Sequence, residues 1–168
     1  MPCGRSQSFV GRGTTLQKVN PNFKELLLAF NAHDAEYLMV GAHALAAYGH
    51  IRATKDLDIW VRPEQANAQK VFQALAAFGA PLSDLTVDDL SRKGTIFQIG
   101  LPPVRIDVIT DIDGVEFAEA WTDRLETVFA GVPTFVISRH HLITNKKTSG
   151  RLQDLADVQQ LESTDNST

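Results

Sequence analysis

Two aspartates one residue apart, in Asp56-Leu57-Asp58, lie inside an apolar run and constrain this chain more than any other feature. Successive side chains of a β-strand point to opposite faces, so the two carboxylates share one face while Leu57 and Ile59 point into the core. Carboxylates held side by side repel each other, and such a pair becomes useful when a divalent cation lies between them. The pattern predicts a strand over residues 56–61 that presents a metal-binding face.

A third aspartate, Asp107, lies in the alternating run 104–110, where Ile106 and Val108 point to the opposite face. If this strand pairs beside the first, the two backbones lie about 4.8 Å apart. The three carboxylates then converge within reach of one or two metal ions, and a two-metal site places its ions roughly 4 Å apart. Asp111 and Asp113 are alternatives to Asp107, but they lie in a predicted turn.

The segment before the aspartate pair has the pattern of a strand, a tight turn and a helix. Residues 37–40 form an apolar run, Gly41-Ala42 follows, and residues 43–48 read as a short helix ended by Gly49. Small residues before a helix leave free backbone N–H groups that can bind an anion such as phosphate. A plain tight connection is the alternative interpretation.

This order of strand, Gly-Ala, short helix, Asp-x-Asp and a later third aspartate resembles the DNA polymerase β superfamily of nucleotidyltransferases. Within it, the chain is most similar to small stand-alone bacterial members related to abortive-infection and toxin–antitoxin nucleotidyltransferases. Residues 142–146 and the run over 150–157, from Gly150-Arg151 to Asp157, are similar to the C-terminal segment of that group. The superfamily usually has Ser or Gly where this chain has Ala42, which keeps the backbone donor and lacks a hydroxyl.

The resemblance implies a catalytic and metal-binding set of Asp56, Asp58 and Asp107, holding two Mg²⁺ ions or Mn²⁺. It also makes Asp107 the general base beside the attacking hydroxyl. The expected nucleotide-binding residues, for ATP or another NTP, are Gly41, Ala42, His43, Arg52, Thr54, Lys55, Lys146 and Arg151. Each has a plainer alternative: His43 as a half-buried helix residue, the 52–55 cations as solvated loop charges, and Lys147 in place of Lys146. His140 and His141 show no metal-ligand spacing.

The expected function is therefore metal-dependent transfer of NMP from an NTP to an acceptor hydroxyl. The acceptor is open: an RNA 3′ end such as that of tRNA, a protein side chain or a small molecule. The resemblance suggests a toxin checked by an antitoxin partner protein. Two alternatives are a catalytically inactive nucleotide- or partner-binding module of the same fold and a two-metal nuclease.

Length and composition fit one ordinary globular domain. The 168 residues predict a tail over 1–20 and a single nucleotidyltransferase-like domain over 21–168. A net charge of −4 argues against a broad nucleic-acid surface. The single cysteine, Cys3, and the lack of a signal peptide or a long apolar run predict a cytoplasmic protein that does not enter a membrane.

The remaining periodicities predict an α/β (α+β) fold, with a mixed sheet flanked by helices and two C-terminal helices. Phe23, Leu26, Leu27 and Phe30 mark one face of a helix that begins near Pro21. A further helix begins with Pro63 in its first turn and stops at Gly79. The other predicted elements are strands over 94–99, 127–130 and 134–137, a turn over 131–133, and helices near 86–90, 117–121, 138–147 and 151–161.

Overall fold

A computed structural model describes residues 20–51, 56–101 and 104–165 of the chain. The strands are β1 (Tyr37–Val40), β2 (Asp56–Val61), β3 (Ile96–Ile99), β4 (Arg105–Ile109), β5 (Leu125–Phe129) and β6 (Val132–Val136). The helices are α2 (Pro21–Ala32), α3 (Gly41–Ala47), α4 (Gln65–Phe78), α5 (Val87–Leu90), α6 (Phe117–Thr122), α7 (Arg139–Ser149) and α8 (Leu152–Asp165). The predicted tail over 1–20 lies outside the described residues except for Asn20, as does the 52–55 loop.

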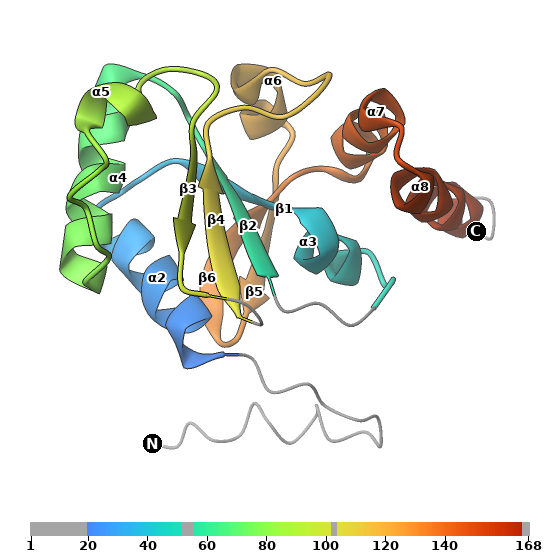
Figure 1. The fold of residues 1–168 in the computed structure, drawn as a ribbon. Coiled ribbons are helices and arrows are strands. Elements are labelled where there is room, and N and C mark those ends of the chain that lie inside the picture. The colour runs from blue at the N-terminus through green and yellow to red at the C-terminus, as the bar shows by residue number, and fades with distance from the viewer. Residues whose placement is uncertain (1–19, 52–55, 102–103, 166–168) are drawn as a thin grey trace.

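The strands form one six-stranded sheet in the order β3-β4-β2-β1-β6-β5. Strands β2 and β4 run parallel, as do β1 and β6, while the other neighbouring pairs are antiparallel. Helices α2, α4 and α5 lie on one side of the sheet, and α6, α7 and α8 lie elsewhere around it (Figure 1). The predicted α/β fold with a mixed sheet is confirmed.

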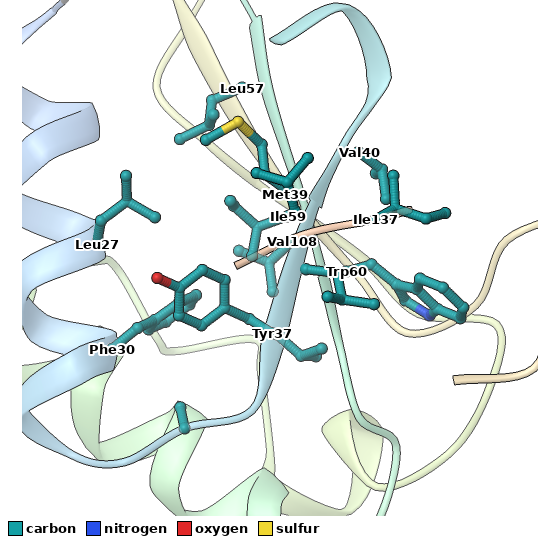
Figure 2. Close-up of a cluster of buried hydrophobic side chains, with 14 of the residues drawn as sticks. Leu27, Phe30, Tyr37, Met39, Val40, Leu57, Ile59, Trp60, Val108 and Ile137 are labelled. Carbon is teal, nitrogen blue, oxygen red and sulfur yellow. The ribbon is translucent and has the colours of Figure 1, made fainter. Parts of the chain in front are cut away.

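One face of the sheet is closed by α2 and α4. Asn20 caps α2 by accepting a 2.8 Å hydrogen bond from the Asn22 amide, and the predicted helix face is fully buried. Figure 2 shows Leu27 and Phe30 of α2 facing Leu57, Ile59 and Val108 of the sheet. The alternation in β2 and β4 thus sends their apolar side chains to this face and leaves Asp58 and Asp107 for the other.

The opposite face is covered only in part by α6. Trp60 points to that side in Figure 2, and its ring meets Phe117 of α6 edge-on at 4.9 Å between centroids. Asp58 and Asp56 lie on the same face of β2 as Trp60, toward the beginning of the strand. Packing with α6 therefore ends where the carboxylates begin.

Several element boundaries differ from those predicted, among them the starts of α3 and α4 and the turn between β5 and β6. Helix α3 begins at Gly41 instead of residue 43, so the predicted Gly41-Ala42 turn is the first part of the helix. Helix α4 begins at Gln65, with Glu64 as its N-cap, and Pro63 precedes it. The turn predicted over 131–133 is instead made by Ala130 and Gly131, which both have positive φ angles (54° and 81°), and β6 already begins at Val132.

Pro133 explains the last difference. The sequence pattern reads this proline as a strand breaker, but β6 pairs with β1 only at Val136. Pro133 is paired with Val128 of β5 and has no ladder partner on its other side. A strand tolerates proline where no neighbouring strand needs its missing N–H.

Across the described ranges, no helix has the length and apolar character needed to cross a membrane.

Candidate functional site

The aspartates of β2 and β4 lie side by side. The two strands are parallel, with Asp58 in register with Asp107 and Asp56 in register with Arg105. Residues in register on neighbouring strands project from the same face, about 5 Å apart at the backbone. The pairing that the sequence analysis required therefore exists, and it sets the three aspartates on one open face.

Arg105 is the charged neighbour that the sequence analysis missed. Its Nε donates to Oδ1 of Asp107 at 2.9 Å, and its Nη2 donates to Oδ2 at 3.3 Å. The same Nη2 lies 3.5 Å from Oδ2 of Asp56. The guanidinium therefore neutralises part of the negative charge of the cluster, and these contacts raise the pKa of Arg105 further.

Asp58 is a carboxyl group that the fold perturbs strongly. Burial, followed by the charges of Asp107 and Asp56, raises its pKa to about 6, although Arg105 and Lys146 oppose the shift. Repulsion of this kind is what a cation placed among the carboxylates would relieve. The electrostatics thus make the cluster receptive to positive charge.

Gly41 allows α3 to approach Asp58 closely. It has a φ of +73°, a conformation that residues with a side chain rarely adopt. A Cβ atom built at Gly41 would collide with Oδ2 of Asp58. The N-cap Val40 makes no side-chain capping bond, so the first backbone N–H groups of α3 have no partner from a capping side chain. Glycine at position 41 therefore allows both the positive φ angle and the close approach of Asp58.

The C-terminal helices contribute a buried ion-pair network. Lys146 of α7 is only 5% exposed, and its Nζ lies 2.9 Å from Asp157 and 3.4 Å from Asp154 of α8. Arg151 donates its Nε to Asp154 at 2.7 Å, yet its own side chain is 79% exposed. Burial disfavours the charged form of Asp154, but hydrogen bonds from Arg151 and Ser149 outweigh it and lower the Asp154 pKa.

Apart from Asp157, the charged side chains described above line one cleft of about 800 Å³. Val40 and Gly41 line it at the junction of β1 and α3, and Gln98, in register with Asp107, lines it from β3. The further lining side chains that matter here are Asp56, Asp58, Arg105, Asp107, Asp111, Asp113, Asn145, Lys146, Arg151 and Asp154. The cleft therefore joins the acidic strand face to the cationic ends of α7 and α8.

The expected nucleotide-binding residues fall into three groups. Gly41, Lys146 and Arg151 line the cleft. Ala42 follows Gly41 in the first turn of α3, and the His43 ring packs edge-on between Phe23 and Phe129, with burial lowering its pKa. The Nε2 atom of His43 is buried without a hydrogen-bond partner among the described residues. Arg52, Thr54 and Lys55 lie outside the described residues, so their assignment stays a prediction.

Asp111 and Asp113, the alternatives to Asp107, also line the cleft. Asp111 accepts a 3.0 Å hydrogen bond from the Gly94 amide, and both side chains are exposed. The Asp113 carbonyl accepts a 2.9 Å bond from Asn145 of α7. The turn that carries them is thereby fixed to α7, next to the carboxylates of the strands.

The residues present suit a hard divalent cation. Three carboxylates on adjacent strands offer the oxygen ligands that Mg²⁺ and Mn²⁺ prefer. The pKa of Asp58 is raised first by burial and then by the charges of Asp107 and Asp56, so a cation bound there would favour the ionised form. Asp56, Asp58 and Asp107 therefore form a fitting donor set for metal ions.

Residues 14–165 match a protein family described as "Nucleotidyltransferase of unknown function (DUF6036)". No protein of curated function matches the chain in sequence. Among solved structures, the chain is similar in fold to the antibiotic-resistance factor ANT(2″)-Ia, with 15% identity and a TM-score of 0.59 over 86% of this chain and 82% of that one.

Two further structures share the fold. The lincosamide antibiotic adenylyltransferase LnuA has 15% identity and a TM-score of 0.56, over 88% of this chain and 99% of that chain. A nucleotidyltransferase from Thermotoga maritima has 10% identity and a TM-score of 0.53, over 90% and 98% of the two chains. At these identities the likeness establishes the architecture that surrounds the cleft.

Proposed function

This chain belongs to the DUF6036 family of nucleotidyltransferases, and we propose that it transfers NMP from an NTP to an acceptor hydroxyl in the cleft between β2, β4 and α7. One observation carries the proposal: Asp58 and Asp107 are in register on neighbouring parallel strands, on the open face of the sheet. The raised pKa of Asp58 and the close approach of α3 at Gly41 support it.

The metal ligands in this proposal are Asp56, Asp58 and Asp107, and the ions are two Mg²⁺, with Mn²⁺ as the alternative. Bound ions of this kind polarise the α-phosphate and offset the charge of the departing pyrophosphate. Arg105 contacts both oxygens of Asp107 and one oxygen of Asp56, so it would share or yield these oxygens when metal ions bind. Its guanidinium then has the charge and the fork geometry to hold a phosphate oxygen.

The remaining residues position the nucleotide. Gly41 lines the cleft and Ala42 follows it in the first turn of α3, where backbone N–H groups have no partner within the helix and can donate to the triphosphate. Arg151 has an exposed side chain that can turn into the cleft, whereas Lys146 is buried and contributes its positive potential from the wall. Roles for His43, Arg52, Thr54 and Lys55 in nucleotide binding are proposed on the resemblance alone.

Asp107 is the proposed general base. It accepts the proton of the acceptor hydroxyl as the acceptor oxygen forms a bond to the α-phosphorus, and the bond from that phosphorus to the β-phosphate oxygen breaks. Pyrophosphate leaves with the bonding electrons. Gln98 faces Asp107 across the β3–β4 ladder, so we place the acceptor on the β3 side of the cleft.

Small molecules are one class of acceptor to test. ANT(2″)-Ia has been solved with adenylyl-2″-tobramycin and LnuA with lincomycin. RNA ends such as that of tRNA and protein side chains are the other classes. A role as a toxin held in check by an antitoxin protein, in the cytoplasm, stays a proposal from the resemblance.

A binding module without turnover is the second candidate, and Arg105 favours it. Its ion pairs with Asp107 and Asp56 occupy oxygens that a catalytic metal needs. A module that binds nucleotide without chemistry would keep this arrangement permanently. The two candidates differ in whether pyrophosphate is released.

The test uses NTPs labelled at the α-phosphate, with Mg²⁺ and a panel of tRNA, cell proteins, tobramycin and lincomycin. We expect label transfer and pyrophosphate release from the wild type. Asp107→Asn should lower turnover by about 100-fold or more, because general-base catalysis contributes that much, while NTP affinity changes far less. Equal losses in turnover and affinity would refute the general-base role, and binding without any turnover would favour the second candidate.

A further inference from the structure

A second group of metal-binding side chains lies away from the cleft, where α6 ends and α7 begins. Asp123 is the C-cap of α6, and His140 and His141 are in the first turn of α7. One ligand atom from each of the three residues lies within 4.8 Å of the other two. The sequence shows no metal-ligand spacing here because Asp123 reaches the two histidines only through the fold.

The distances suit one small cation. Oδ2 of Asp123 lies 3.6 Å from Nε2 of His140 and 3.9 Å from Nδ1 of His141. Two ligands bound at about 2.1 Å to a tetrahedral zinc ion lie about 3.4 Å apart. His140 and Asp123 are 65% and 48% exposed, so small side-chain rotations close the gap without disturbing the core.

The donor set selects the class of metal. Two imidazole nitrogens and one carboxylate oxygen suit Zn²⁺ and related divalent transition metals, whereas Mg²⁺ and Ca²⁺ favour sites made of oxygen. Three protein ligands also leave a fourth position for water. We propose that Asp123, His140 and His141 bind one divalent transition-metal ion of the Zn²⁺ class, at a site separate from the carboxylate cleft.

Ser138 is placed to orient the first ligand. Its hydroxyl lies 3.3 Å from Nδ1 of His140 and can accept from that nitrogen when it is protonated. The Nε2 lone pair, which faces Asp123, is then free for the metal, as a hydrogen bond on one ring nitrogen fixes the other as the ligand. The ligand atom of His141 is Nδ1, which is 3.0 Å from the Ser138 hydroxyl. This nitrogen would exchange that contact for the metal.

The metal would secure the helix that forms one wall of the cleft. Near its C-terminal end, α7 is already fixed to the Asp111–Asp113 turn by the 2.9 Å bond from Asn145 to the Asp113 carbonyl. An ion shared by Asp123, His140 and His141 would fix its N-terminal end to α6. Helix α7 presents Asn145, which makes the first of these attachments, and Lys146 to the cleft.

The experiment measures Zn²⁺ binding to the full chain, with Co²⁺ as a second, spectroscopic probe. A large excess of Mg²⁺ in the buffer occupies oxygen-ligand sites and does not compete for imidazole. The variants are His140→Ala and Asp123→Asn, both at exposed positions, with His33→Ala as a matched control because His33 is the C-cap of α2 and not part of the proposed site. Thermal unfolding without metal verifies that each variant is folded.

We expect the wild type and His33→Ala to bind one Zn²⁺ per chain, and their Co²⁺ complexes to show the visible absorption of a nitrogen-ligated ion. His140→Ala and Asp123→Asn should each weaken Zn²⁺ binding by more than about 10-fold, because losing a ligand costs at least as much as losing an outer hydrogen-bond partner. Zn²⁺ should also raise the melting temperature of the wild type and not that of His140→Ala. No binding in excess Mg²⁺, or binding unchanged by both substitutions, would overturn the proposal.

Discussion

At Asp58 the fold holds a carboxyl group where its negative charge is costly. Burial and the neighbouring Asp107 and Asp56 raise its pKa from 3.8 to about 6. The folded chain therefore binds this proton more tightly than the unfolded chain does. The stability that the protonated group contributes is present below pH 3.8 and is lost as the pH rises through about 6.

Asp58→Asn should therefore stabilise the metal-free protein. At pH 7.5 in EDTA, we expect its free energy of unfolding to exceed that of the wild type by up to about 3 kcal/mol, the value of a shift of roughly 2 pKa units. The difference should shrink below pH 6 and vanish near pH 4. Urea unfolding across this range measures it, with the exposed Asp84→Asn as control. A less stable Asp58→Asn protein at pH 7.5 would contradict the electrostatic account.

Single residues were predictable where a strand period determines them. The alternation in residues 56–59 and 104–108 was enough to separate Asp56, Asp58 and Asp107 from the apolar side chains of their own strands. The same alternation puts Arg105 on the face of Asp107, and this signal was available but not used. Which carboxylates the guanidinium reaches depends on the β2–β4 register, which a single strand pattern does not contain.

At the scale of elements, the junction between β1 and α3 connects the helix to the metal-binding strand. Gly41 and Gly49, at the two ends of this helix, both have positive φ angles, 73° and 90°. A Cβ at Gly49 would meet nothing within 4 Å, whereas at Gly41 it would collide with Asp58. Substitutions at these two glycines therefore distinguish the effect of backbone strain, which both share, from the effect of the close approach to Asp58, which only Gly41 has.

Gly41→Ala and Gly49→Ala should both lose about 1–2 kcal/mol of stability, because alanine is disfavoured at positive φ. Only Gly41→Ala should also abolish Mg²⁺-dependent NTP binding, because it displaces Asp58. Chemical unfolding and calorimetric titration measure the two effects. Equal NTP affinity in the two variants would show that the close approach is not needed for the site.

The pairing of α7 with α8 depends on a buried lysine. Lys146→Met should destabilise the protein by about 3 kcal/mol, because it leaves Asp157 buried without its cation. Lys147→Met is the matched control: its partner Glu162 is exposed, and exposed pairs contribute about 0–1 kcal/mol. Urea unfolding of the two variants tests this. Equal stability would mean that Lys146 is not a structural cation.

Element types followed from periodicity, and element boundaries depended on contacts outside each segment. The buried face of α2 and the strand over 56–61 appear where the apolar spacing predicts them. The hairpin turn was misplaced because Pro133 looks like a turn residue until the neighbours of β6 are known. Helix α3 begins at Gly41, where a Cβ atom would collide with Asp58, and the local sequence does not show this contact.

At the scale of the whole molecule, the strand order decides which residues meet. The sequence predicts strands around Asp58 and Asp107, but only the order β3-β4-β2-β1 makes them neighbours. The meeting of Asp123 with His140 and His141 likewise depends on how α6 and α7 are connected through β5 and β6. Contacts between segments far apart in the chain are therefore the part of the site that local patterns miss.

Among the residues that the structure describes, those lining the cleft lie between Val40 and Asp154. Deleting residues 1–18 should accordingly leave Mg²⁺-dependent NTP affinity within about 2-fold of the full chain, less than about 0.4 kcal/mol of binding free energy. Calorimetric titration and a thermal melt of the truncated protein measure this. Unfolding or loss of binding on truncation would show that the site extends to the N-terminal residues.

The central claim is that the aspartate face of β2 and β4 binds a nucleotide through metal. Isothermal titration of ATP, GTP, CTP and UTP with Mg²⁺ tests it, using the wild type and an Asp56→Ala/Asp58→Ala double variant. We predict that at least one NTP binds the wild type only when Mg²⁺ is present, and that the double variant loses this binding. Binding of equal strength in the double variant, or no binding of any NTP to the wild type, would contradict the claim.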